Sequence, residues 1–147
     1  MAEKQKRNLI RKLTQYPDAA LLAEVVRLQA RISRGGGAGA LDILRRETRP
    51  RGRPRTRESI DRHVNLGLRI GAMFGLLNSC LTRSVVRCVL LNRSGVTARV
   101  AFGLNKDGDT LDGHCWVLID GEDDGSHIAS KFHDVKIYPE AESCKTP

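Results

Sequence analysis

The sequence predicts an α+β domain in which helices come first and a small antiparallel sheet follows. Three observations favour this class. Apolar side chains recur at helical spacing within residues 18–32, 56–77 and 80–92. They alternate over residues 96–104, as in a strand with one buried face. Asp107-Gly108 is a strong hairpin signal directly after that strand. Helices followed by hairpin-linked strands are typical of α+β domains.

The first expected helix begins after Asp18, a plausible N-cap, and continues to about Ile32. Residues 34–39 are rich in glycine and predict a flexible break, with a short helix at 41–46. Residues 49–55 alternate arginine with proline or glycine, which predicts an extended, solvated segment.

Thr56 or Ser59 can cap the next helix, which is expected to reach about Leu77. Small residues recur every four positions along it, and such a stripe predicts close packing of another backbone. The stripe consists of Gly67, Gly71 and Gly75.

After the Asn78-Ser79 break, a buried helix is expected over Cys80–Asn92, with Gly95 just past its end. The strand over 96–104 and the returning strand over 114–120 then form a hairpin. A second turn over 121–125 and a last strand within 126–138 complete the expected sheet.

The net charge of +8 is concentrated at the N-terminal end. Residues 1–60 hold 15 Lys and Arg against 6 Asp and Glu, while residues 61–147 hold 10 against 11. We therefore expect three regions. They are a basic helical region with flexible linkers (1–57), a core domain (58–139) and a flexible tail (140–147). A basic region suggests an acidic partner.

Cys80 and His114 stand in the two settings that a thiol nucleophile needs. Cys80 opens a helix, whose N-terminus favours a thiolate, and its backbone N–H groups can hold an oxyanion. His114 opens a strand, from which an imidazole can accept the thiol proton. The alternation of a strand turns Cys115 away from His114, so we expect Cys115 in the core, as we do Cys88 on its helix.

Three segments resemble the transglutaminase-like cysteine proteases of lasso-peptide biosynthesis, the leader peptidases often called B proteins. The resemblance covers about residues 58–139. It rests on Asn78-Ser79-Cys80-Leu81-x-Arg83, Gly95-Val96-x-Ala98-Arg99-Val100-x-Phe102-Gly103 and Gly113-His114-Cys115-Trp116-Val117-x-x-Asp120-Gly121.

The resemblance implies a transglutaminase/papain-like core and a cysteine peptidase that removes a leader peptide from a ribosomally made precursor. Cys80 is then the nucleophile and His114 its base. The length suits the split form, in which a small separate protein binds the leader and a cyclase acts on the product. The family usually has alanine after the histidine, where this chain has Cys115.

The acid that orients His114 is not evident, because Ser126 occupies the family's aspartate position. Asp120 is on the same strand as His114, about 20 Å along it, and is too far away. Asp124 is the first choice, if the hairpin is shorter than usual. Asp134 is the second, if the turn centres on Asp124-Gly125 and places residue 135 opposite His114.

Two other functions compete with the peptidase. The doubtful aspartate leaves open a catalytically silent domain that binds peptides. Arg51-Gly52-Arg53-Pro54 matches the core of an AT-hook that enters A·T-rich minor grooves, but a solvated basic linker explains it better. We therefore expect no nucleic acid as a partner, and we suggest that the basic segment contacts the leader.

The histidines and cysteines lack ligand spacing, so we expect neither a metal nor an organic cofactor. No apolar run is long enough to span a membrane, and no export signal opens the sequence, so a cytoplasmic protein with reduced thiols is expected.

Overall fold

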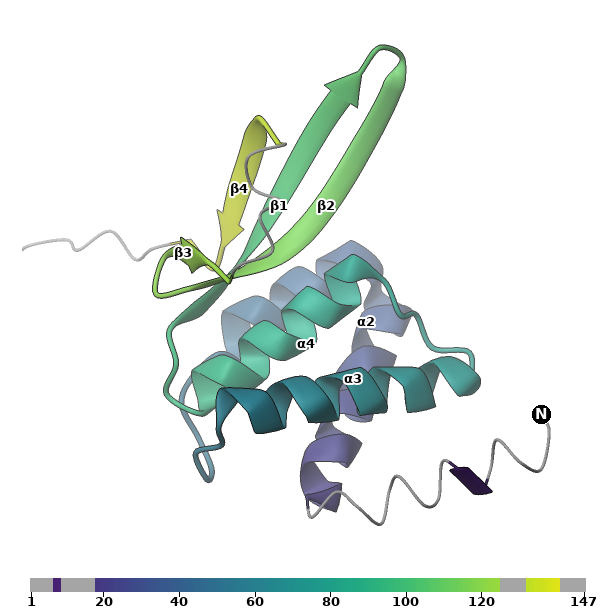
Figure 1. Cartoon of the computed structure of the whole chain (residues 1–147), viewed down its shortest axis with the longest axis vertical. Helices are drawn as coiled ribbons and strands as arrows, with labels where there is room; N and C mark the ends of the chain where they lie inside the picture. Colours follow the sequence, from purple (N-terminus) through teal and green to yellow (C-terminus); the bar gives the residue numbers. More distant parts are fainter. Residues whose placement is uncertain (1–6, 9–17, 125–131, 141–147) are drawn as a thin grey trace, which may run out of the picture.

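The computed structural model describes residues 7–8, 18–124 and 132–140. Between residues 18 and 140 its described part contains helices followed by strands, and the predicted α+β class is confirmed. Figure 1 shows the helices grouped on one side of the sheet, with the β1–β2 hairpin projecting past them. The elements are α2 (Ala19–Arg46), α3 (Arg57–Met73), α4 (Cys80–Arg93), β1 (Ala98–Asp107), β2 (Thr110–Ile119), β3 (Glu122–Asp123) and β4 (Asp134–Tyr138).

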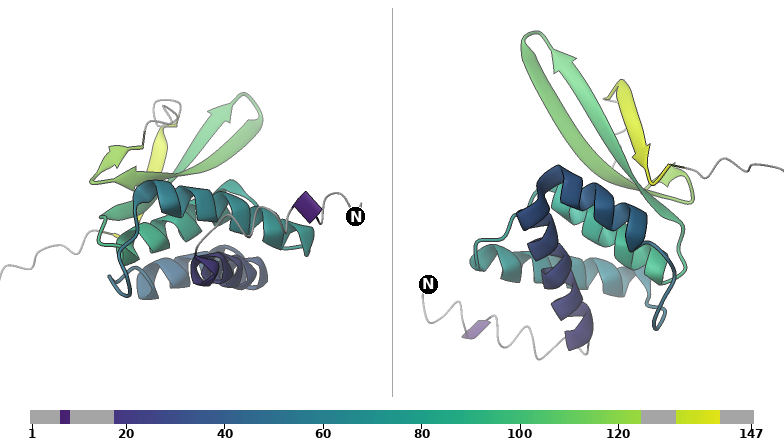
Figure 2. Two further views of the ribbon diagram at one scale, coloured as in Figure 1. Left: turned by 60° about the horizontal axis from the view of Figure 1, so that its bottom comes forward. Right: turned by 180° about the vertical axis from the view of Figure 1, so that it is seen from behind.

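Helix α2 begins as predicted and turns a corner at its glycine run. The Leu21 N–H donates to Asp18 Oδ1 over 2.9 Å, so Asp18 is the N-cap. Gly36 has φ 58° and ψ −147°, a conformation that glycine adopts readily. The expected break is therefore a kink with helix on both sides, and Figure 2 shows the two halves at an angle. Burial of Ile43 and Leu44 holds the second half against the core.

Helix α3 starts at the predicted cap and ends earlier than expected. Thr56 is the N-cap, because its Oγ1 accepts from the Ser59 N–H over 3.2 Å. The helix ends at Met73 rather than near Leu77, since Gly75 adopts φ 82° and the chain leaves the helix there.

The small stripe of α3 packs closely on α2 at two of its three positions. A Cβ added at Gly67 would lie 2.5 Å from Val25 Cγ1, and one at Gly71 would lie 1.8 Å from Gln29 Oε1. A Cβ at Gly75 would meet open space. The predicted close approach is confirmed for Gly67 and Gly71.

Helix α4 lies between the other helices and the sheet, and packs on α2, α3, β1 and β2. Ser79 caps its start, accepting from the Thr82 N–H over 3.2 Å. Gly95, with φ 87°, follows its end as predicted, and the Val96 N–H returns to the Leu91 carbonyl over 3.0 Å.

The four-stranded sheet has the order β3-β2-β1-β4. The β1–β2 hairpin pairs Gly103 with His114, and β4 pairs antiparallel with the other edge of β1, where Gly103 faces Val135. The expectation that residue 135 lies opposite His114 is therefore wrong, because β1 separates β4 from β2.

A single apolar core joins α2 to the later elements. Its buried side chains come from all three helices and both hairpin strands, including Leu28, Ile43, Leu68, Val85 and Val117. Helix α2, which the sequence places in the basic region 1–57, thus belongs to the core. Residues 49–55 form neither helix nor strand, as predicted, and residues 141–147 of the expected tail lie outside the described part. Of the described helices, none combines the length and apolar character that crossing a bilayer requires.

Candidate active site around Cys80

Cys80 is the first residue of α4 and its side chain is exposed. Ser79 accepts hydrogen bonds from two N–H groups in the first turn of α4. Its hydroxyl accepts from the Thr82 N–H, and its carbonyl accepts from the Arg83 N–H. The N–H groups of Cys80 and Leu81 come first in the helix and have no intrahelical acceptor. An anion on or beside Cys80 would meet these two amides and the positive end of the helix dipole.

Cys115 approaches Cys80 from β2. It lies on the strand face that packs against the helical core, together with Phe102 of the neighbouring strand. Leu81, the neighbour of Cys80 in the chain, lines one cavity with Phe102, the cross-strand partner of Cys115. Burial, followed by the interaction with Cys80, raises the pKa of the Cys115 thiol to about 12. Cys115 is half-buried against the core, and its contact with Cys80 is a feature that the sequence did not reveal.

His114 lies on the other face of the sheet. Its ring stacks on Trp116, with centroids 6.5 Å apart, and on Phe132, with centroids 5.9 Å apart. Trp116 shares the face of His114 as predicted, and it is 4% exposed. The structure thus brings Cys80 to Cys115, one residue from His114, and turns the imidazole away from the thiol.

Gly103 makes room for this aromatic cluster. A Cβ at Gly103 would lie 2.7 Å from Phe132 Cβ and 2.8 Å from Trp116 Cη2. Phe132 was not foreseen as part of the site. The signal that could have found it is Gly103, because a glycine inside a strand often marks a close approach.

The structure does not bring Asp124 to His114. Asp124 follows β3, which pairs with Leu118 and Ile119, about 13 Å along β2 from His114. Its carboxylate instead accepts a hydrogen bond from Arg87 of α4, which also binds Asp61 of α3 at 2.6 Å. Arg87 thereby ties the end of the sheet to two helices.

The second choice, Asp134, does not reach His114 either. It starts β4 and pairs with Leu104 of β1. The full width of β1 therefore separates it from β2. In the part of the chain that the structure describes, neither predicted acid is placed to orient the imidazole.

Cys88 lies in the core, as predicted. It is 0% exposed, and burial raises the pKa of its thiol to about 12. Its Sγ donates to the Ala98 carbonyl over 3.3 Å. A thiol held in this way is a poor nucleophile near neutral pH.

An apolar cavity of about 200 Å³ opens beside the start of α4. Phe102 and Tyr138, whose rings meet edge to face at 5.6 Å, form one wall, and Leu81 lies next to Cys80 in the chain. Lys136, Gly37 and Leu41 complete the lining. The cavity gives an extended apolar side chain a place to bind near the Cys80 thiol.

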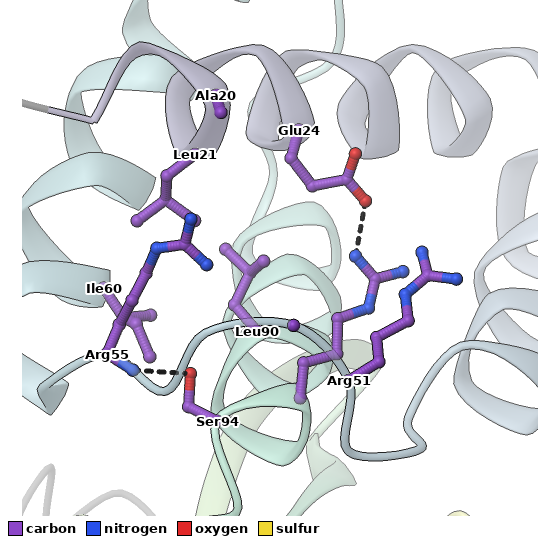
Figure 3. Close-up of a pocket in the computed structure, with 10 residues that line it drawn as sticks. Ala20, Leu21, Glu24, Arg51, Arg55, Ile60, Leu90 and Ser94 are labelled. Carbon is purple, nitrogen blue, oxygen red and sulfur yellow. Dashed lines mark hydrogen bonds and ion pairs between the residues drawn. The ribbon is translucent and has the colours of Figure 1, made fainter.

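A second pocket, of about 320 Å³, lies at the opposite end of α4 and is formed by the basic segment. Figure 3 shows Arg51 and Arg55 lining this pocket together with the apolar side chains of Leu21, Ile60 and Leu90. Arg55 binds Asp18 at 2.6 Å, and the Arg51 N–H donates to the Arg93 carbonyl. The 14 residues of α4 separate this end from Cys80 by about 20 Å.

A family model described as Transglutaminase-like superfamily matches residues 22–132, more than half of the 147 residues. The chain belongs to the transglutaminase-like superfamily. The matched range contains all of α2 after its first three residues and the whole of α3, α4, β1, β2 and β3, together with Cys80 and His114. Neither a curated protein nor a solved structure matches the chain. Transglutaminase-like domains commonly include cysteine peptidases, and an exposed cysteine at a helix start is compatible with that chemistry.

Proposed function

We propose that this transglutaminase-like protein is a cytoplasmic cysteine peptidase that removes the leader from a ribosomally made precursor during lasso-peptide maturation. The observation that carries the proposal is the exposed Cys80 thiol at the first position of α4, beside an apolar cavity. The resemblance of the segments around Cys80, Gly95–Gly103 and His114 to the B proteins supplies the substrate class.

The proposed reaction is acyl transfer through Cys80. Its thiolate attacks the scissile carbonyl, and the amides of Cys80 and Leu81 hold the oxyanion. His114 protonates the departing amine, and water then releases the leader as a free acid. The His114 ring must leave Trp116 and Phe132 to do so, and because the Cβ of a strand residue is fixed to one face, this requires the backbone of β2 to move as well.

The basic segment 49–57 is the proposed contact for the leader or for a small protein that carries it. About 20 Å of α4 separates this segment from Cys80, a span of about six extended residues. Neutralising Arg51, Arg53 and Arg55 should weaken leader capture and raise KM. Turnover at saturating precursor should persist, because these side chains lie at the far end of α4.

The test is cleavage of a precursor by the purified protein together with its leader-binding partner, followed by mass spectrometry. Cys80→Ala should abolish cleavage and retain the wild-type thermal transition, because the side chain is exposed. Cys88→Ala is the matched control and should keep activity in the fraction that folds. A Cys80→Ala protein that still cuts the precursor would refute the proposal.

A catalytically silent peptide-binding domain is the second candidate. The position of His114 favours it, since the ring stacks on the face away from Cys80. This candidate predicts that the wild-type protein binds the precursor without cutting it. It also predicts that His114→Ala binds the precursor with unchanged affinity, whereas a peptidase would lose turnover on the same substitution.

A further inference from the structure

We propose that Cys80 and Cys115 form a reversible disulfide, which blocks the Cys80 thiol at the start of α4. The two residues come from elements that pack on each other, α4 and β2. Leu81, next to Cys80, lines one cavity with Phe102, which is paired with Cys115 across the sheet. The two thiols therefore lie on neighbouring surfaces of one packed interface, and the pKa of Cys115 is raised in part by Cys80.

The two thiols differ in the way that a reactive and a resolving cysteine differ. Cys80 is exposed and accessible to a small oxidant, while Cys115 is half-buried behind it. Exposure and thiolate character select the cysteine that is oxidised first. Cys80 is thus the site of attack, and Cys115 is the neighbour that can capture the oxidised sulfur.

The oxidant is a peroxide, and the reaction has two steps. The Cys80 thiolate attacks one oxygen of hydrogen peroxide, which gives a sulfenic acid and releases hydroxide. The Cys115 sulfur then attacks the Cys80 sulfur, which breaks the S–O bond, and water leaves with the Cys115 proton. Two thiols lose two hydrogens in total, and one peroxide is reduced to two waters.

The other cysteine of the described residues is not suited to this role. Cys88 is 0% exposed, and its Sγ donates to the Ala98 carbonyl over 3.3 Å.

Loss of peptidase activity on oxidation depends on the proposed function, because it requires Cys80 to be the nucleophile. Formation of the disulfide does not depend on it. The readout below is therefore the covalent bond itself, so that the two proposals can fail separately.

Trypsin places each cysteine on its own peptide, which makes the bond easy to locate. Cys80 lies on residues 70–83, Cys88 on 88–93, Cys115 on 107–131 and Cys144 on 137–145. The wild-type protein is treated with hydrogen peroxide, blocked with N-ethylmaleimide and digested without reductant. We expect peptides 70–83 and 107–131 to be linked with the loss of two hydrogens, and dithiothreitol to separate them.

Cys88→Ala is the matched control, and it should give the same link. Cys115→Ala should instead accumulate a dimedone-reactive sulfenic acid on Cys80 that proceeds to the sulfinic acid, which dithiothreitol does not reverse. The proposal is overturned if wild-type Cys80 is recovered as sulfinic acid with Cys115 still alkylatable after unfolding. A link from Cys80 to Cys144 in place of Cys115 would overturn it equally.

Discussion

Gly67 of α3 lies against Val25 of α2, so close that a Cβ on the glycine would come within 2.5 Å of Val25 Cγ1. One turn further along α3, Gly71 lies against Gln29, whose Nε2 donates to the carbonyls of Leu68 and Leu77. The two glycines let the helices approach, and Gln29 then fixes the chain that leaves α3 and leads to Cys80.

Gly67→Ala should destabilise the fold by about 1–3 kcal/mol, because Val25 is fully buried and its branched side chain cannot move aside. Chemical denaturation measures the loss. Gly35→Ala is the control, since a Cβ there meets open space and its φ is not positive, and it should change stability little. Equal effects of the two substitutions would disprove the close packing of α2 and α3.

The three cysteines of the described residues should label in a fixed order with iodoacetamide at neutral pH, Cys80 far ahead of Cys115 and Cys88. Cys80 is exposed, while pKa values raised to about 12 keep the other two as thiols. Labelling followed by peptide mapping measures the order. Fast modification of Cys88 in the folded protein would contradict the burial found here.

The same raised pKa values predict that stability falls in alkaline solution. An unfolded thiol ionises near pH 8.5, whereas the folded Cys88 thiol holds its proton until about pH 12. The unfolded state therefore binds fewer protons above pH 8.5, and the free energy of unfolding decreases as the pH rises toward 12. Cys88→Ala should show a shallower decrease in urea melts from pH 8 to 10.

Arg93 is the centre of a buried ion network that joins α4 to α2. Its side chain is 8% exposed and pairs with Glu24 and Glu47. Arg93→Ala removes one partner from each carboxylate, while Arg27 stays paired with both, and should cost about 1–3 kcal/mol at pH 7. Arg46→Ala, which removes an exposed pair with Asp42, should cost less than about 1 kcal/mol.

The network also predicts a response to acid. Hydrogen bonds, first from Arg27 and then from Arg93, lower the pKa of Glu24 from 4.5 to about 2. The contribution of ionised Glu24 to the free energy of unfolding is therefore complete above pH 4.5 and is lost as the pH falls toward 2. Urea denaturation at pH 7 and pH 3 should show a smaller acid-induced loss for Arg93→Ala than for wild type. An identical loss in both proteins would argue against the role of Arg93.

Asp124→Asn should lower stability about as much as Asp61→Asn, because both carboxylates bind Arg87. If precursor cleavage is detected, both variants should retain the wild-type pH profile of turnover. A selective loss of turnover in Asp124→Asn alone would instead show that Asp124 reaches His114 during catalysis.

Local signals predicted most of the elements because they act within a few residues. Asp18 and Thr56 cap helices through bonds three residues away, and Gly95 ends α4 through its own positive φ. The alternation over β2 also placed Cys115 and Trp116 on opposite faces correctly. Each of these features depends on the residue and its immediate neighbours.

Two long-range features of the fold could not be predicted from such local signals. Alternation says which residues share a face, but it does not say which face the helices cover, and here they cover the face of Cys115. A last strand can join either edge of a hairpin, and β4 joins β1. Both features depend on packing between distant segments: the first separates His114 from Cys80, and the second separates Asp134 from His114.

The projecting β1–β2 hairpin has an exposed tip and a buried base, and the two parts tolerate sequence change differently. Apart from half-buried Asn105, the side chains of residues 104–113 are exposed, while the base of the same strands holds Val100 and Val117 in the core. Residues can be added or lost at the tip without opening the interior. The length of this arm can therefore change among descendants of the protein while the buried base of the two strands stays the same.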